Sequence, residues 1–191
     1  MKIISVLISV FFVSNLYAQE ESIQKIKERY AAVNSKNAGY QTHTLELNTM
    51  QAAIGLQTTK INFRYLAFQP DPEDEPSKWE YSLAKTTVTY NISDEMKYRT
   101  EYLFDKNQQL VFYSKKAIGK WENYEYRYYF DNQKLLKVII SGINEMGLKI
   151  NYTNTKNFKE KDLNYANKCL LNAEKYLSFF ELLPEIEYLD K

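Results

Sequence analysis

The sequence predicts an α+β fold, an antiparallel meander sheet of about seven strands with an N-terminal helix and a long C-terminal helix packed on one face. Between residues 40 and 141, apolar residues recur mainly at every second position, which is the period of a half-buried strand. Near both ends of the chain they recur at steps of three and four, which is the period of an amphipathic helix. The 17 Tyr and 10 Phe against 5 Gly and 4 Pro agree with long strands in a compact chain.

The first eighteen residues predict a secretory signal peptide, cleaved between Ala18 and Gln19. They hold a single Lys2, followed by a largely apolar run from Ile3 to Val13. This run is too short to span a bilayer, and no later segment approaches the ~20 apolar residues that a spanning helix needs. We therefore expect export to the periplasm or the extracellular space, with residues 19–191 forming one domain.

The net charge limits which partners the protein can attract, and the cysteine content limits how its fold can be stabilised. Loss of the signal peptide would remove one Lys and no acidic residue, which leaves 24 basic and 24 acidic residues. A neutral chain has no long-range field for nucleic acid, and we expect no such partner. Because Cys169 is the only cysteine, no intrachain disulfide is possible and the fold must be stable through burial alone.

The first predicted helix covers residues 20–36. Its apolar stripe is narrow, so it should lie on a surface rather than inside a core, and Ser22 is the expected N-cap. The stripe residues are Ile23, Ile26, Tyr30 and Val33.

The second predicted helix is the clearest in the chain. It begins after Asn157, which has capping-box spacing to Glu160, and it ends at Pro184. Its stripe alternates steps of three and four through Leu163, Ala166, Leu170, Ala173, Leu177 and Phe180.

Seven segments between the helices have strand periodicity, and short polar turns join the last four of them. The segment 69–78 holds three prolines and four acidic residues, which predicts a solvated loop; calcium binding by its acids is the alternative. The predicted strands are 41–49, 58–68, 79–92, 97–105, 109–116, 124–131 and 134–141.

The last four strands are two copies of one hairpin. With Tyr98 aligned to Tyr124, the pattern aromatic-x-x-x-Tyr-x-Phe-Asp recurs 26 residues later. The charges are exchanged between the copies, because Arg99 and Glu101 correspond to Glu125 and Arg127. This pattern is typical of a meander that grows by hairpin addition.

The strand 124–130 carries four aromatic residues on one face. Such a face is either a buried core or an adhesive surface. Both helices need a surface on which to bury their stripes. We therefore expect this aromatic face to belong to the core, with the tyrosine hydroxyl groups reaching solvent at its edge. The four residues are Tyr124, Tyr126, Tyr128 and Phe130.

Two tryptophans are the strongest candidates for a ligand or partner surface. Trp79 follows the acidic loop and Trp121 precedes the Tyr-rich strand, so both lie at strand ends, where scaffolds present binding residues. Tyr81 and Tyr124 lie close to them in the sequence. Each indole either binds a ligand or covers the end of the hydrophobic core.

Catalytic patterns are sparse. His43 and Cys169 would be the only base and thiol of a nucleophilic pair, and a buried inert thiol is the simpler interpretation. One imidazole cannot form a histidine-based metal cluster, and we expect no cofactor. Paired carboxylates for glycoside hydrolysis stay open, since four Glu residues lie on predicted strands, namely Glu46, Glu80, Glu101 and Glu125.

The order of segments resembles that of small secreted proteins of unknown function from Gram-negative gut and marine bacteria. The segments that carry this resemblance are SIQKIKERY, NTMQAAIGLQTTKINFRY and YFDNQKLLKVI. The hairpins EYLFDKNQQL and RYYFDNQKL are also similar to those of the antitoxin-like MORN-variant repeats, although the turn glycine is missing and only two copies exist.

The sequence favours a non-enzymatic binding protein whose partner is a protein or a glycan. A periplasmic hydrolase that uses sheet carboxylates is the alternative. Clustered acids in a deep pocket would favour the enzyme, whereas a shallow aromatic surface would favour binding. The oligomeric state stays open.

Overall fold

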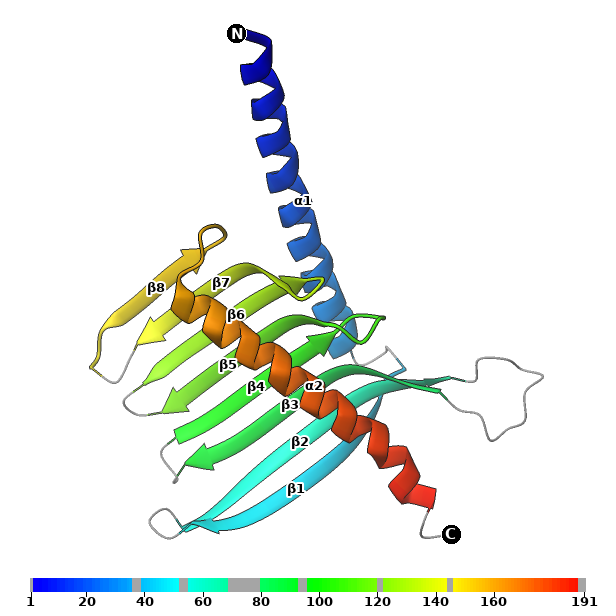
Figure 1. Ribbon diagram of the computed structural model, residues 1–191. Helices are drawn as coiled ribbons and strands as arrows, with labels where there is room; N and C mark the ends of the chain where they lie inside the picture. The colour runs from blue at the N-terminus through cyan, green and yellow to red at the C-terminus, as the bar shows by residue number, and fades with distance from the viewer. Residues whose placement is uncertain are drawn as a thin grey trace, which may run out of the picture.

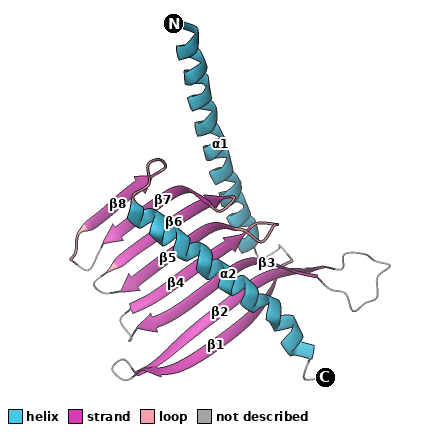
Figure 2. Cartoon of the chain, in the orientation of Figure 1, coloured by secondary structure: helices cyan, strands magenta, loops and turns pink. Residues whose placement is uncertain are grey.

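The computed structural model has an eight-stranded antiparallel sheet in which each strand pairs with the next one along the chain (Figures 1 and 2). The α+β meander is therefore confirmed, with one strand more than expected. The described backbone covers residues 2–35, 39–51, 55–68, 80–92, 96–119, 122–143 and 146–188, and the described side chains begin at residue 18 and end at residue 183. The strands are β1 (Gln41–Gln51), β2 (Gly55–Phe68), β3 (Glu80–Ile92), β4 (Met96–Phe104), β5 (Leu110–Gly119), β6 (Asn123–Asp131), β7 (Lys134–Ile143) and β8 (Lys149–Asn154).

The two helices, α1 (Lys2–Asn34) and α2 (Glu160–Tyr188), lie on opposite faces of the sheet, not on one face as expected. In β4, Leu103 packs with α1, whereas its neighbours Tyr102 and Phe104 pack with α2. The reason is that β4 and β6 end in continuous apolar runs, which point side chains to both faces. Each face therefore needs a cover, and each helix supplies one (Figure 1).

The face beneath α2 is the larger core. Its buried sheet residues include Phe63, Leu83 and Tyr113, and they meet Cys169 and Phe180 of α2. The predicted stripe of α2 is confirmed except at its start, where the side chain of the first stripe residue, Leu163, is exposed.

The ends of α2 differ from the prediction. The helix begins at Glu160, and Asn157 has a left-handed backbone (φ 50°) outside it, so this residue is not the N-cap. The helix also continues past Pro184 to Tyr188. A proline removes one backbone hydrogen bond, and here that loss does not end the helix.

The helix α1 packs on the other face through the stripe that the sequence predicts. Ile23, Ile26 and Val33 are buried. Ser22 lies inside the continuous helix and is not an N-cap. Two polar anchors fix the helix to the sheet: Gln19 Nε2 donates to the Leu136 carbonyl over 2.6 Å, and Arg29 Nε donates to the Phe104 carbonyl over 2.5 Å.

The aromatic face of β6 is part of the core under α2, as expected. Tyr128 and Phe130 are buried, and Tyr126 is half-buried with its ring stacked on Tyr165 at 5.8 Å. The hydroxyl group of Tyr165 lies 2.9 Å from that of Tyr113, so the buried phenols satisfy each other.

The two copies of the hairpin differ at their turns. In the second copy Asn132 and Gln133 both have positive φ (47° and 62°), which is the geometry of a two-residue type I′ turn. In the first, the Asp105 carboxylate accepts hydrogen bonds from the backbone of Asn107 and Gln109, both at 2.8 Å, and closes a longer turn. The one-residue difference in sequence therefore changes the turn and leaves the strands equivalent.

Candidate functional site

The predicted aromatic surface falls partly outside the described residues, since neither Trp79 nor Trp121 is among them. Tyr81 is half-buried, with its ring edge against Tyr65 at 5.8 Å. Tyr124 is half-buried and lies edge-on to Tyr126 at 5.1 Å. Both described tyrosines thus belong to the margin of the core.

The strand register separates Tyr81 from Tyr124. Tyr124 pairs with Ala117, which pairs with Tyr98. Tyr98 in turn pairs with Tyr90, which is nine residues beyond Tyr81 in β3. At about 3.3 Å per residue, the two tyrosines are roughly 30 Å apart along the strands. They do not form one surface.

His43 and Cys169 have separate surroundings. The imidazole of His43 stacks on the ring of Tyr65 at 4.6 Å. The thiol of Cys169 is buried in α2, and burial raises its pKa. A thiol with a raised pKa forms little of the nucleophilic thiolate, which is why Cys169 behaves as a core residue.

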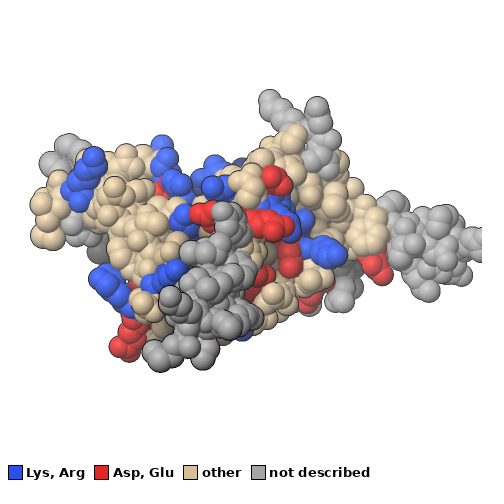
Figure 3. Space-filling model, turned by 90° about the horizontal axis from the view of Figure 1, so that it is seen from above, with Lys and Arg blue, Asp and Glu red and all other residues tan. Residues whose placement is uncertain are grey.

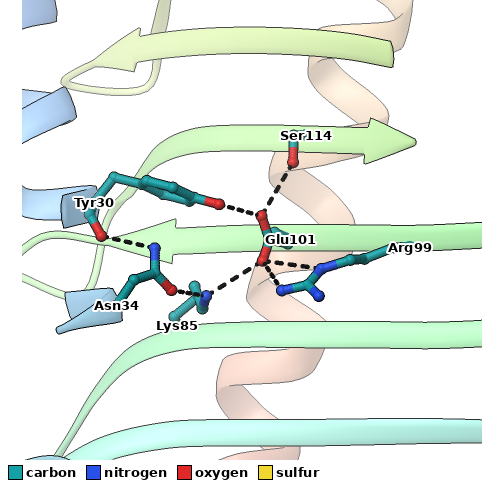
Figure 4. Close-up of polar contacts among 6 residues, drawn as sticks. All are labelled: Tyr30, Asn34, Lys85, Arg99, Glu101 and Ser114. Carbon is teal, nitrogen blue, oxygen red and sulfur yellow. Dashed lines mark hydrogen bonds and ion pairs between the residues drawn. The ribbon is translucent and has the colours of Figure 1, made fainter. Parts of the chain in front are cut away.

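One of the sheet carboxylates occupies the centre of a polar cluster on the α1 face, which we call the Glu101 cluster (Figure 4). Glu101 Oε2 accepts a hydrogen bond from the Tyr30 hydroxyl over 2.6 Å and lies 3.5 Å from the Ser114 hydroxyl. Its Oε1 accepts from Arg99 (2.7 Å) and from Lys85 (3.2 Å). The members of the cluster are Tyr30, Asn34, Lys85, Arg99, Glu101 and Ser114.

The members of the Glu101 cluster come from four elements. Tyr30 and Asn34 come from α1, while Lys85 comes from β3. Asn34 accepts a hydrogen bond from Lys85 and donates to the backbone carbonyl of Tyr30 over 2.7 Å. The last turn of α1 is thereby tied to the sheet through a fully engaged buried carboxylate.

Opposing effects act on the charges of the cluster. Burial alone would raise the pKa of Glu101, but the Tyr30 hydrogen bond and the charges of Lys85 and Arg99 outweigh burial and hold this pKa below its ordinary value. Burial lowers the pKa of Lys85 more than the Glu101 charge raises it. Burial, with the Glu101 hydrogen bond and charge, raises the pKa of Tyr30 to about 12.

A pocket of about 280 Å³ opens beside the cluster, between α1 and the sheet. We call it the α1 pocket. Tyr30 and Ser114 belong both to the pocket wall and to the Glu101 cluster. Its lining residues are Ile26, Lys27 and Tyr30 of α1, Phe112 and Ser114 of β5, and Glu125, Arg127 and Tyr129 of β6.

The α1 pocket combines aromatic rings with a partly exposed ion pair. Phe112 lies 5.4 Å from the ring of Tyr30 and 5.0 Å from that of Tyr129. The Arg127 guanidinium contacts the Glu125 carboxylate at 2.5 Å, and their side chains are 38% and 29% exposed. A ligand would therefore meet apolar ring surface, hydrogen-bond donors and hydrogen-bond acceptors together.

Sequence reasoning did not single out Lys27, Ser114 and Arg127 as site residues. Arg127 lies on the face of β6 opposite the aromatic row, where alternating charges also indicate an ordinary solvated surface. One feature of the sequence could have indicated this site. Ser114 and Arg127 each interrupt a run of apolar residues, and they are paired with each other on the neighbouring strands β5 and β6.

Charges of both signs lie interspersed over the described residues seen from above (Figure 3). Within the described chain, no group of three or more His, Cys, Asp or Glu side chains is arranged to hold a metal ion. None of the helices, so far as they are described, is long and apolar enough to cross a membrane. Comparisons of the chain with protein-family models, with curated proteins and with solved structures found no match.

Proposed function

We propose that the protein is an exported, non-enzymatic binding protein that holds a short glycan in the α1 pocket. The observation that carries the proposal is the combination of three aromatic rings with the Glu125–Arg127 ion pair around one small cavity. A sugar ring has apolar C–H faces and a rim of hydroxyl groups. Aromatic side chains pack on the apolar C–H faces, and a carboxylate and a guanidinium form hydrogen bonds with the hydroxyl groups.

The size of the pocket favours a glycan over a protein partner. Its volume of about 280 Å³ is at the lower limit of small-molecule sites, which begin at roughly 300 Å³. A stable protein partner would need roughly 800 Å² of surface on each side. A concave site of this size suits a ligand of one or two sugar units.

The charge state of Glu101 weighs against the hydrolase alternative. A glycosidase needs one carboxylic acid whose pKa is raised, so that it can protonate the leaving group. The pKa of Glu101 is lowered instead, and both of its oxygens accept hydrogen bonds from neighbouring side chains. Glu101 is therefore suited to holding α1, and unsuited to proton transfer.

The contacts of α1 are compatible with export after cleavage. Gln19, which anchors α1 to the sheet, and the α1 residues that line the pocket, Ile26, Lys27 and Tyr30, all follow the expected cleavage position. Removal of residues 1–18 would leave these contacts and the α1 pocket in place.

The proposal is tested by saturation-transfer difference NMR on the exported protein with a panel of monosaccharides and disaccharides. We expect at least one sugar to receive saturation, and we expect Arg127→Ala to abolish the signal. Lys115→Ala is the matched control, because Lys115 is on the same sheet but on the α2 face, over the ring of Tyr98. A signal that survives Arg127→Ala, or no signal from any sugar, would contradict the proposal.

A further inference from the structure

The α2 face of the sheet has an opening of its own, which is separate from the α1 pocket. It lies between the second half of α2 and the strands β1 and β2, and its volume is about 440 Å³. We call it the α2 groove. Its apolar walls are Leu45 and Leu47 of β1, Ile61 of β2, and Tyr176 and Phe179 of α2.

The α2 groove exists because α2 rests on β2 and leaves the edge strand β1 uncovered. The ring of Phe63 in β2 lies 5.8 Å from Phe179, 5.9 Å from Phe180 and 6.5 Å from Tyr176. Both Phe63 and Phe180 are fully buried, so this contact is part of the core. These packed aromatic rings form the bottom of the groove, and the groove opens toward β1.

Two walls of the groove are apolar side chains that remain exposed. Leu47 is 45% exposed and Phe179 is 37% exposed. Both line the groove, Leu47 from β1 and Phe179 from α2. A hydrocarbon chain laid between them would remove both from water, which is the main source of affinity for an apolar ligand.

The helix also contributes polar groups to the same groove. Asn172 and Lys175 are three residues apart in α2, hence on one side of the helix, and both line the groove. Among the described residues, the ion pairs do not include Lys175. An ammonium group at the margin of an apolar groove is complementary to the anionic end of an amphiphile.

We propose that the α2 groove binds a single-chain amphiphile with a carboxylate headgroup, that is, a long-chain fatty acid. The hydrocarbon chain lies between Leu47 and Phe179, and the carboxylate is bound by Lys175. This site is independent of the proposed glycan pocket, since the two lie on opposite faces of the sheet and share no residue.

The test uses the exported protein and cis-parinaric acid, a fluorescent fatty acid whose emission rises in an apolar site. We expect saturable binding to the unmodified protein. Leu47→Glu should weaken this binding at least tenfold, because it places a negative charge on the path of the chain. Because Leu47 is exposed, we expect Leu47→Glu to fold normally. Circular dichroism of the variant checks its folding. The matched control is Leu56→Glu, an equally drastic change at an exposed leucine of β2 that does not line the groove.

The role of Lys175 is tested by comparing the acid with its methyl ester. Lys175→Gln should weaken binding of the acid about five- to tenfold, as expected for loss of one partly exposed charge-assisted bond, and should leave the ester unchanged. Equal loss with Leu47→Glu and Leu56→Glu would place the ligand outside the groove and overturn the proposal. Co-sedimentation with phosphatidylglycerol vesicles in the absence of cis-parinaric acid binding would also overturn it, since the charge would then be attracted to a membrane surface.

Discussion

The hydroxyl group of Tyr30 in α1 donates to the carboxylate of Glu101 in β4 over 2.6 Å, across 71 residues of sequence. This bond connects α1 to a buried charge in the middle of the sheet. The position of α1, and with it the shape of the α1 pocket, therefore depends on the Glu101 cluster as well as on apolar contacts.

Replacement of Glu101 should be strongly destabilising. Glu101→Gln leaves the charges of Lys85 and Arg99 without a carboxylate partner, and Lys85 is almost fully buried. Loss of one member of a buried ion pair costs about 3–5 kcal/mol in the free energy of unfolding. Urea unfolding at neutral pH measures this loss.

The matched control is Glu125→Gln. The Glu125–Arg127 pair is partly exposed, so its loss should change the free energy of unfolding by about 1 kcal/mol or less. Equal effects of the two substitutions would show that the burial of Glu101 does not determine its contribution.

The same carboxylate should make stability depend on acid. The pKa of Glu101 in the folded protein is below its ordinary value of 4.5, so its stabilising contribution is fully present above that value. The contribution is lost as pH falls through the folded pKa, where the carboxylate takes up a proton. Urea midpoints between pH 6 and pH 3 should fall less steeply for Glu101→Gln than for the unmodified protein. Parallel pH profiles would contradict the assignment.

Two adjacent phenylalanines in α2 should respond very differently to truncation. Phe180 is 2% exposed and packs on Phe63 and Tyr65, whereas Phe179 is 37% exposed. Phe180→Ala should cost about 3–5 kcal/mol by opening a cavity in the core. Phe179→Ala should cost clearly less, because its site collapses toward solvent. Thermal unfolding of both variants checks the order, and a reversed order would mean that α2 is rotated on the sheet.

Gly142 in β7 should tolerate no side chain. Its φ is 131°, and a Cβ there would lie 2.1 Å from the backbone carbonyl oxygen of Asn123 in β6. Gly142→Ala must therefore separate two paired strands, and we expect it to be far less stable by urea unfolding. Gly147→Ala is the control: its φ is 72° with open space around the site, so only the left-handed strain of about 1–2 kcal/mol should appear.

The sequence was sufficient for the elements whose periodicity is simple. The stripe of Ile23, Ile26 and Val33 is buried as expected, and the aromatic row of β6 faces the core, with Tyr128 and Phe130 buried. The strand β8 was missed because its six residues carry only Ile150 and Tyr152 as apolar members, which is too short a pattern to distinguish from a loop. The placement of helices on opposite faces was not predicted from the sequence. Continuous apolar runs, such as those that end β4 and β6, place apolar side chains on both faces of the sheet, and a pattern of alternation that indicates one apolar face does not reveal the second.

The α1 pocket was beyond the reach of sequence periodicity for a different reason. Glu101, Lys85 and Arg127 look like members of a solvated sheet face, and strand alternation assigns them correctly to one side. What buries Lys85 and Glu101 is the position of α1 over that side, which is a relation between segments far apart in sequence. Strand-end position alone gives no distance between Tyr81 and Tyr124, and the strand register is what separates them.

The meander also has a kinetic consequence. Every strand pairs only with its neighbour in sequence, so the sheet can form by successive local hairpins with little loop-closure entropy. The hydrogen bonds that dock α1 span 51 to 136 residues, and they can form only after the later strands are in place. Docking of α1 should therefore follow the rate-limiting step of folding, so that Ile26→Ala accelerates unfolding and leaves the folding limb of a chevron plot nearly unchanged.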